Sequence, residues 1–171
     1  GGVVALGPDG YWFVKDGRVE SLPLFCSRSI RAVLADPLRA LWVASGTGLW
    51  RHTAEGDTLY QAEEDILAAD ARGLALAADG ALYAAGLGGV TIYRGGRRIG
   101  EHTAANGLPS PFTQAIAVAA DGTLWVGTDI GLARYDGRSW SLLHSRRWLP
   151  DDDVRGVALD SEATAWVVTR R

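Results

Sequence analysis

Four polar side chains recur at a constant spacing along this chain of 171 residues. Each stands two residues before an apolar residue, and successive members are 41, 42 and 41 residues apart: Arg31, Arg72, Gln114 and Arg155. A guanidinium group offers donors that match the two oxygens of a carboxylate. If the fold brings these positions together, they would form a site for an anion such as a uronate. The alternative is that each arginine lies at the surface and pairs with a nearby Asp or Glu.

A second candidate site lies in the segment 145–148, where Arg147 precedes Trp148. An aromatic ring in a polar loop offers a flat face on which a sugar ring or a cation can stack. The alternative is that Trp148 anchors this loop on the structure beneath it. The sequence leaves both interpretations open.

Other chemistry finds little support in the sequence. The histidines form no metal-binding pair, and the glycine-rich segment 86–89 lies between two expected strands, so it lacks the helix that a phosphate loop requires. The segment 151–153 holds three aspartates, which favour an acidic loop over a calcium site. Cys26 is the only cysteine, which excludes an internal disulfide and a thiolate zinc site. We therefore predict no catalytic residue, no metal and no cofactor.

Composition narrows the class of protein. The chain is 47% apolar and 22% charged, as is usual for a globular protein, and its net charge is −3. An acidic chain argues against nucleic acid as a partner, because nucleic-acid binders usually carry a basic face. No apolar run reaches the roughly 18 residues of a membrane span, so we expect no membrane contact in this segment.

The elements that would position these residues are repeats of about 40 residues. An aromatic residue recurs at the same spacing as the candidate arginines, at Trp42, Tyr83, Trp125 and Trp166. Within one repeat we predict four strands, at 116–118, 124–127, 132–135 and 140–143. Asp-Gly dipeptides at 121–122 and 136–137 suit the tight turns between them.

Four strands in a repeat of this length indicate a β-propeller blade. The recurring aromatic residues then fill the wedge between neighbouring blades, with sugar stacking as the alternative. The Ala- and Glu-rich segment 62–72 falls where two blades connect, and we expect at most a short helical turn there. The predicted fold class is all-β, with about four four-stranded blades.

The repeat also predicts where the units begin and end. We expect three complete blades, at 30–70, 71–112 and 113–153, flanked by partial blades at 1–29 and 154–171. The strand count is seventeen, one more than a closed four-bladed ring would need. We therefore expect the chain to be part of a larger propeller of six to eight blades, completed by other sequence.

The two runs at 122–128 (GTLWVGT) and 131–137 (GLARYDG) resemble the two-component regulator propeller repeat. This family builds the periplasmic sensor domains of bacterial hybrid histidine kinases and of some diguanylate cyclases. The resemblance implies a periplasmic input domain, often for carbohydrate-derived signals. The chain departs from the repeat at three positions. Ala77 and Ala119 stand where the family repeat has Asp, and Arg39 stands where it has Gly. We expect these changes to weaken single turns.

The leading functional hypothesis is therefore a ligand-binding sensor propeller that is not itself an enzyme. Its ligand would be a carbohydrate or another small anion. Its partners would be the remaining blades and a downstream kinase or cyclase module, and a homodimer is also compatible with the sequence. Two alternatives stay open: a scaffold that binds other proteins, and a propeller lyase or hydrolase, because some propellers are enzymes.

Overall fold

The computed structural model of the chain describes residues 3–7, 10–15, 18–22, 30–38, 40–60 and 70–171. Within these residues there are seventeen strands and one short 3-10 helix, η2 (Ala104–Asn106). The all-β class is therefore confirmed. No helix among the described residues is long and apolar enough to cross a membrane. The helical turn predicted at 62–72 falls mostly on residues 61–69, which lie outside the described part.

Consecutive strands pair antiparallel in five sheets, which we number in chain order. The first sheet contains β1 (Val3–Gly7), β2 (Gly10–Lys15) and β3 (Arg18–Leu22). The second contains β4 (Ile30–Ala35), β5 (Leu41–Ser45), β6 (Gly48–Thr53) and β7 (Gly56–Tyr60). The third contains β8 (Gly73–Leu76), β9 (Leu82–Gly86), β10 (Gly89–Arg94) and β11 (Arg97–His102). The fourth contains β12 (Thr113–Val118), β13 (Leu124–Thr128), β14 (Gly131–Tyr135) and β15 (Trp140–Leu143), and the fifth contains β16 (Val154–Leu159) and β17 (Ala165–Thr169).

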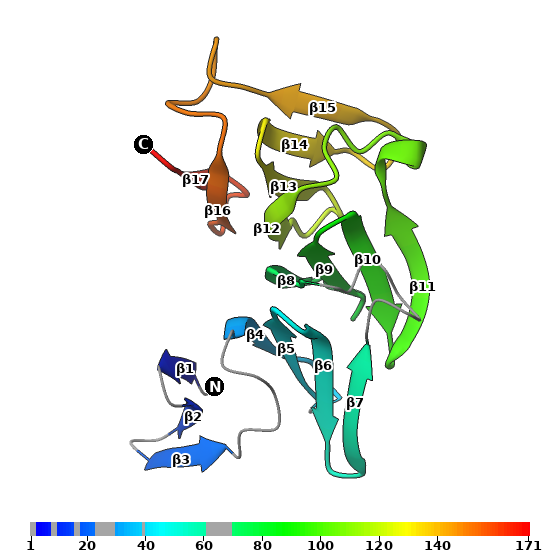
Figure 1. Ribbon diagram of the computed structural model, residues 1–171, viewed down its shortest axis with the longest axis vertical. Coiled ribbons are helices and arrows are strands. Elements are labelled where there is room, and N and C mark those ends of the chain that lie inside the picture. Colours follow the sequence, from blue (N-terminus) through cyan, green and yellow to red (C-terminus); the bar gives the residue numbers. More distant parts are fainter. Residues whose placement is uncertain (1–2, 8–9, 16–17, 23–29, 39, 61–69) are drawn as a thin grey trace.

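The sheets follow one another around a common centre, and the first strand of each complete sheet is the innermost (Figure 1). Strand β8 contacts both β4 and β12, and β12 also contacts β16. This is the arrangement of propeller blades, and the predicted architecture is confirmed. The residue limits of the blades stay a prediction.

Aromatic residues fill the space between the second and third sheets. Trp42 and Tyr93 are almost fully buried, and their ring centroids are 5.5 Å apart. Tyr60 stacks on Trp42 at 5.8 Å and donates a hydrogen bond from its hydroxyl to the carbonyl of Gly96, at 2.6 Å. Each such ring pair contributes about 0.5–1.5 kcal/mol beyond its buried area. The recurring aromatic at position 42 thus packs between blades, as the repeat predicts.

A similar cluster joins the third and fourth sheets. The half-buried imidazole of His102 lies 4.8 Å from the ring of Tyr135 and 5.3 Å from that of Trp140, centroid to centroid. Burial lowers the pKa of His102 because it disfavours the charged imidazolium. The neutral ring therefore belongs to the core of this junction.

A glycine opens the third strand of each complete sheet for a steric reason. Gly48, Gly89 and Gly131 have φ angles of 133°, 140° and 138°, a region that L side chains rarely adopt. A Cβ atom at any of the three would also collide with a backbone carbonyl of the fourth strand. The three glycines thus allow that strand to pack close to the turn.

The turn between the first and second strands shows why the repeat favours Asp. The Asp36 carboxylate accepts hydrogen bonds from the Ala40 amide, at 2.9 Å, and from the indole Nε1 of Trp42, at 3.0 Å. Asp160 makes the same contact with the indole of Trp166, at 3.1 Å. Where Ala77 replaces this Asp, the turn still closes through its backbone amide, which donates to the Ala81 carbonyl at 2.8 Å.

Trp166, on the last described sheet, is exposed. Its side chain is 64% exposed, whereas its counterpart Trp42 is 1% exposed. The third sheet covers Trp42, whereas among the described residues no sheet follows β17. Whether Trp166 packs against a following blade therefore stays a prediction.

Candidate functional site

The four predicted polar residues lie at equivalent β-bulges where the first strands begin. In the second sheet, Ile30 pairs with Ser45 and Ala32 with Ala44, which leaves Arg31 as the extra residue. The same shift in register occurs at Gln114 and at Arg155, as the pairings of β12 and β16 show. We call this end of the sheets the bulge face. A bulge redirects its extra side chain, so the repeat places one polar group per blade at this face.

Arg72 occupies the corresponding place in the third sheet. Its backbone amide donates to the carbonyl of Ala85, at 2.8 Å, and Gly73 pairs with that same residue. Arg72, which precedes β8, and Gly73, the first residue of β8, thus both oppose Ala85 of β9. The bulge geometry was not visible in the sequence, because an alignment column carries no hydrogen-bond register.

Carboxylates connect the bulge residues of neighbouring sheets. Asp70 forms an ion pair with Arg31 of the second sheet. Asp70 also accepts bonds from Arg72, from Nη2 at 2.6 Å and from Nε at 2.9 Å. Two arginines therefore converge on one carboxylate, which sits in the left-handed region at φ 55°. Such a conformation is uncommon outside glycine, although Asp adopts it more readily than most residues.

Asp153 repeats this arrangement between the fourth and fifth sheets. Its carboxylate accepts bonds from Gln114 Nε2 and from Arg155 Nη2, each at 2.6 Å. Hydrogen bonds from Arg155 and then Gln114 lower the pKa of Asp153, and Asp153 in turn raises the pKa of Arg155. We call Asp70 and Asp153 carboxylate bridges. Sequence analysis missed both, although each stands two residues before a bulge arginine, and that repeated spacing was a usable signal.

A cavity of about 430 Å³ opens on the bulge face. It is lined from the third, fourth and fifth sheets by Arg72, Phe112, Gln114, Asp129, Asp153, Arg155 and Arg170. Three of the predicted residues are thus brought together, whereas Arg31 is not part of the lining. Phe112, Asp129 and Arg170 were not predicted. Three guanidinium groups and two carboxylates line this bulge-face pocket, and Arg72 and Arg155 pair with Asp70 and Asp153. The arrangement suits an anion or a polar ligand that shares these donors.

Arg147 and Trp148 form a separate feature, because neither lines the bulge-face pocket. They lie in a turn in which the Trp148 amide donates to the His144 carbonyl, at 3.0 Å. The Trp148 side chain is 60% exposed, and the guanidinium carbon of Arg147 lies 4.9 Å from its ring centroid. With that exposure the ring is not packed into the structure beneath the loop.

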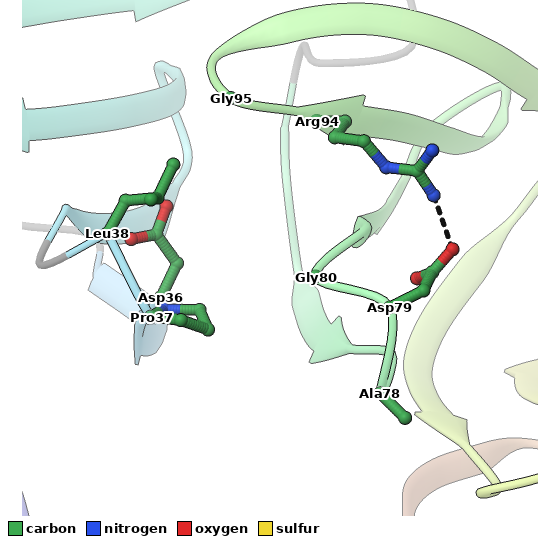
Figure 2. Close-up of a pocket in the computed structure, with 8 residues that line it drawn as sticks. All are labelled: Asp36, Pro37, Leu38, Ala78, Asp79, Gly80, Arg94 and Gly95. Atoms are coloured by element: carbon green, nitrogen blue, oxygen red, sulfur yellow. Dashed lines mark hydrogen bonds and ion pairs between the residues drawn. The ribbon is translucent and has the colours of Figure 1, made fainter.

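The opposite end of the sheets, which we call the hairpin face, holds the turns between first and second strands. A cavity of about 360 Å³ lies there between the turn at 36–38 and the turn at 78–80 (Figure 2). Figure 2 shows Arg94 turned toward Asp79, with which it forms an ion pair on one wall. Asp36 on the other wall already bonds to Ala40 and Trp42. The charged groups of this hairpin-face pocket therefore already have partners within the chain.

The histidines and the acidic loop do not assemble a reactive centre. His52 lies on β6 against Asp57, and His102 lies in the aromatic cluster described above. Asp152 accepts from the Ser145 amide while Asp153 bridges two sheets, so neighbouring carboxylates serve different partners. Across the described residues, no group of three or more His, Cys, Asp or Glu side chains is placed to hold a metal. Cys26 lies outside the described part.

Residues 107–129 match the family described as "Two component regulator propeller". The chain contains a two component regulator propeller repeat. The matched residues include β12 and β13 and thus contribute Phe112, Gln114 and Asp129 to the bulge-face pocket. The resemblance predicted from the sequence is confirmed. No curated protein matches the chain.

Solved structures with the same fold include extracellular domains of two component systems and enzymes. The extracellular domain of a hybrid two component system from B. thetaiotaomicron has a TM-score of 0.69 and 17% identity, over 92% of this chain and 24% of that one. A streptogramin B lyase has a TM-score of 0.69 and 15% identity, over 96% of this chain and 60% of that one. A gluconolactonase from Xanthomonas campestris has a TM-score of 0.64 and 16% identity, over 95% of this chain and 63% of that one.

These likenesses establish the propeller fold and nothing about chemistry, since every identity is below 25%. The chain spans about a quarter of the extracellular domain and less than two thirds of either enzyme.

Proposed function

We propose that this segment is the ligand-binding part of an extracytoplasmic sensor propeller and is not itself catalytic. The observation that carries the proposal is the bulge-face pocket, where Arg72 of the third sheet and Arg155 and Arg170 of the fifth line one cavity. Arginine donors are fixed in a planar fork, so three of them favour a small anionic ligand. Its output would be a kinase or cyclase module of the parent protein. In support, the extracellular domain of a hybrid two component system shares the fold.

The position of the pocket supports a sensing role. It is lined by residues of three sheets, so a ligand bound there contacts all three blades at once. A ligand that binds one relative arrangement of the blades more tightly than another shifts the population toward the first arrangement. The difference in affinity sets the size of that shift. A propeller with such a site can therefore pass the presence of a ligand to a domain attached elsewhere.

The lyase or hydrolase alternative has less support from the site. An acid–base pair at a cavity is the usual requirement for such chemistry. His52 and Asp57 are in contact, yet neither lines the bulge-face pocket. Among the described residues that do line it, none is a histidine.

Calorimetric titration of the purified chain with small carboxylates, acidic saccharides and neutral saccharides tests the proposal. We expect an anionic compound to bind, and we expect Arg155→Gln to weaken that binding by about tenfold or more, because it removes a charge-assisted donor. Arg94→Gln is the matched control, since Arg94 lies at the hairpin-face pocket and its loss should leave affinity unchanged. Equal affinity for Arg155→Gln and the unmodified chain would contradict the assignment of the pocket.

A further inference from the structure

One position in the repeat breaks the pattern of carboxylate bridges. The residue two places before each bulge residue is Asp70, Phe112 or Asp153 in the third, fourth and fifth sheets. The two aspartates each reach back to the bulge residue of the preceding sheet. At the junction of the third and fourth sheets, Phe112 stands where that carboxylate would be.

The substitution changes the surroundings of Arg72. Arg31 receives its carboxylate from the following sheet, whereas Arg72 directs Nε and Nη2 back to Asp70. In the described part of the chain, Nη1 of Arg72 has no acceptor. The side chain of Arg72 is 30% exposed, and both it and Phe112 line the bulge-face pocket. The pocket therefore offers a guanidinium edge at the junction that lacks a bridge.

Backbone contacts hold Phe112 in this place. Its backbone pairs with Leu87, and the neighbouring Pro111 carbonyl accepts from the Gly88 amide at 2.9 Å. The side chain of Phe112 is nevertheless 50% exposed. An aromatic ring that is fixed at its backbone and open to solvent is a preformed surface for an apolar face of a ligand.

We propose that the ligand is a sugar acid, whose carboxylate binds Arg72 while its ring packs on Phe112. The carboxylate takes the part that Asp70 and Asp153 have at the other two junctions, so the ligand completes the row of carboxylate bridges. The chain itself displays a carboxylate as the acceptor at both equivalent places. This inference rests on the proposed binding role of the pocket and names the class of its ligand.

The rest of the lining extends the same chemistry. Gln114 and Asp153 provide an amide and a carboxylate edge, which suit sugar hydroxyl groups. Arg155 and Arg170 belong to the fifth sheet and its C-terminal side and line the same pocket. A chain of two or more uronate units would therefore place its further carboxylates near additional guanidinium groups.

Substitution at position 112 gives the sharpest test. Phe112→Asp installs the missing carboxylate, which pairs with Arg72 and occupies the place of the ligand. We expect binding of galacturonate oligomers, measured by calorimetry, to weaken by more than about tenfold. Phe112→Leu keeps an apolar side chain without an aromatic ring and should weaken binding less. Arg94→Gln is the control, because Arg94 lies at the hairpin-face pocket and its loss should leave the affinity unchanged.

Three probes separate the two halves of the site. Galacturonate oligomers carry ring and carboxylate, the matched neutral galactose oligomers carry the ring alone, and acetate carries the carboxylate alone. We expect the first to bind more tightly than either of the others. Equal binding of the neutral oligomers would overturn the role of Arg72, and equal binding of acetate would overturn that of Phe112.

Amide hydrogen exchange provides a readout that does not depend on affinity. A ligand that bridges the third and fourth sheets should slow exchange at Gly88 and Phe112, and a circular dichroism melt of each variant checks that it folds. If Arg155→Gln weakens binding of some anion while Phe112→Asp and Phe112→Leu do not, the sugar-acid inference is wrong and the proposed function stands. If no saccharide or carboxylate binds, both are wrong.

Discussion

The two faces of this propeller use aspartate in different ways. On the hairpin face, Asp36 bonds to an indole six residues further along the same sheet. On the bulge face, Asp70 and Asp153 bond to side chains 39 residues earlier, in the preceding sheet. The same residue type in a repeat therefore closes a turn at one end of the blades and joins blades at the other. A ligand that changes the position of one blade relative to the next would therefore meet side-chain bonds between blades at the bulge face.

The largest expected effect compares two contributions to the stability of the hairpin face: burial of a tryptophan side chain and the hydrogen bond from its indole to Asp. Trp42 and Trp166 both donate to an Asp of the repeat, but only Trp42 is buried. Trp42→Ala should lower the free energy of unfolding by about 3–5 kcal/mol through loss of buried area and the cavity left behind. Trp166→Ala should cost less than about 1 kcal/mol. Urea denaturation measures both, and similar losses would mean that the bond dominates.

A smaller effect separates bonds within a sheet from bonds between sheets. Asp70→Ala leaves Arg31 and Arg72 without their shared carboxylate and should cost about 1 kcal/mol, because both guanidinium groups are partly solvated. Asp36→Ala should cost a similar amount by freeing a buried indole N–H. The two variants should differ in where amide hydrogen exchange increases. We expect the increase at β4 and β8 for Asp70→Ala, and only within the second sheet for Asp36→Ala. The same exchange pattern in both would remove the contrast between the faces.

The smallest effect concerns pH. The pKa of His102 is lowered by burial, so the unfolded chain binds a proton at a higher pH than the folded chain does. Stability should therefore fall as pH falls through about 6.5, the ordinary value for histidine, and level off below the folded pKa. His102→Tyr, which copies Tyr60 at the equivalent position, should flatten this dependence in thermal melts between pH 7 and pH 5. An unchanged slope would assign the dependence to other groups.

Much of this fold follows from periodicity. The spacing of Trp42, Tyr83, Trp125 and Trp166 predicted the repeat, and the tight-turn dipeptides predicted the hairpins of β12 to β15. The column of Arg31, Arg72, Gln114 and Arg155 predicted which residues share one face. These are local patterns, since side-chain alternation and turn chemistry depend on neighbours in sequence.

The candidate site was only partly predictable. The arginine column was found, yet Phe112, Asp129 and Arg170 in the same pocket were not. Asp129 lies in the turn between β13 and β14, and Arg170 follows β17, so neither shares a repeat position with the arginines. They meet the arginines only because strands of different sheets end at the same face.

The sequence by itself determined the repeat, the four-stranded unit, the glycine at the start of each third strand and the residues that recur at the bulge face. Each of these depends on contacts within one unit or on a spacing that the units share. Only the tertiary structure decided that Asp70 and Asp153 connect neighbouring sheets, that Phe112 interrupts their row and that a pocket opens there. Those features depend on groups about 40 residues apart coming within hydrogen-bonding distance, and packing of the sheets around one centre brings them together.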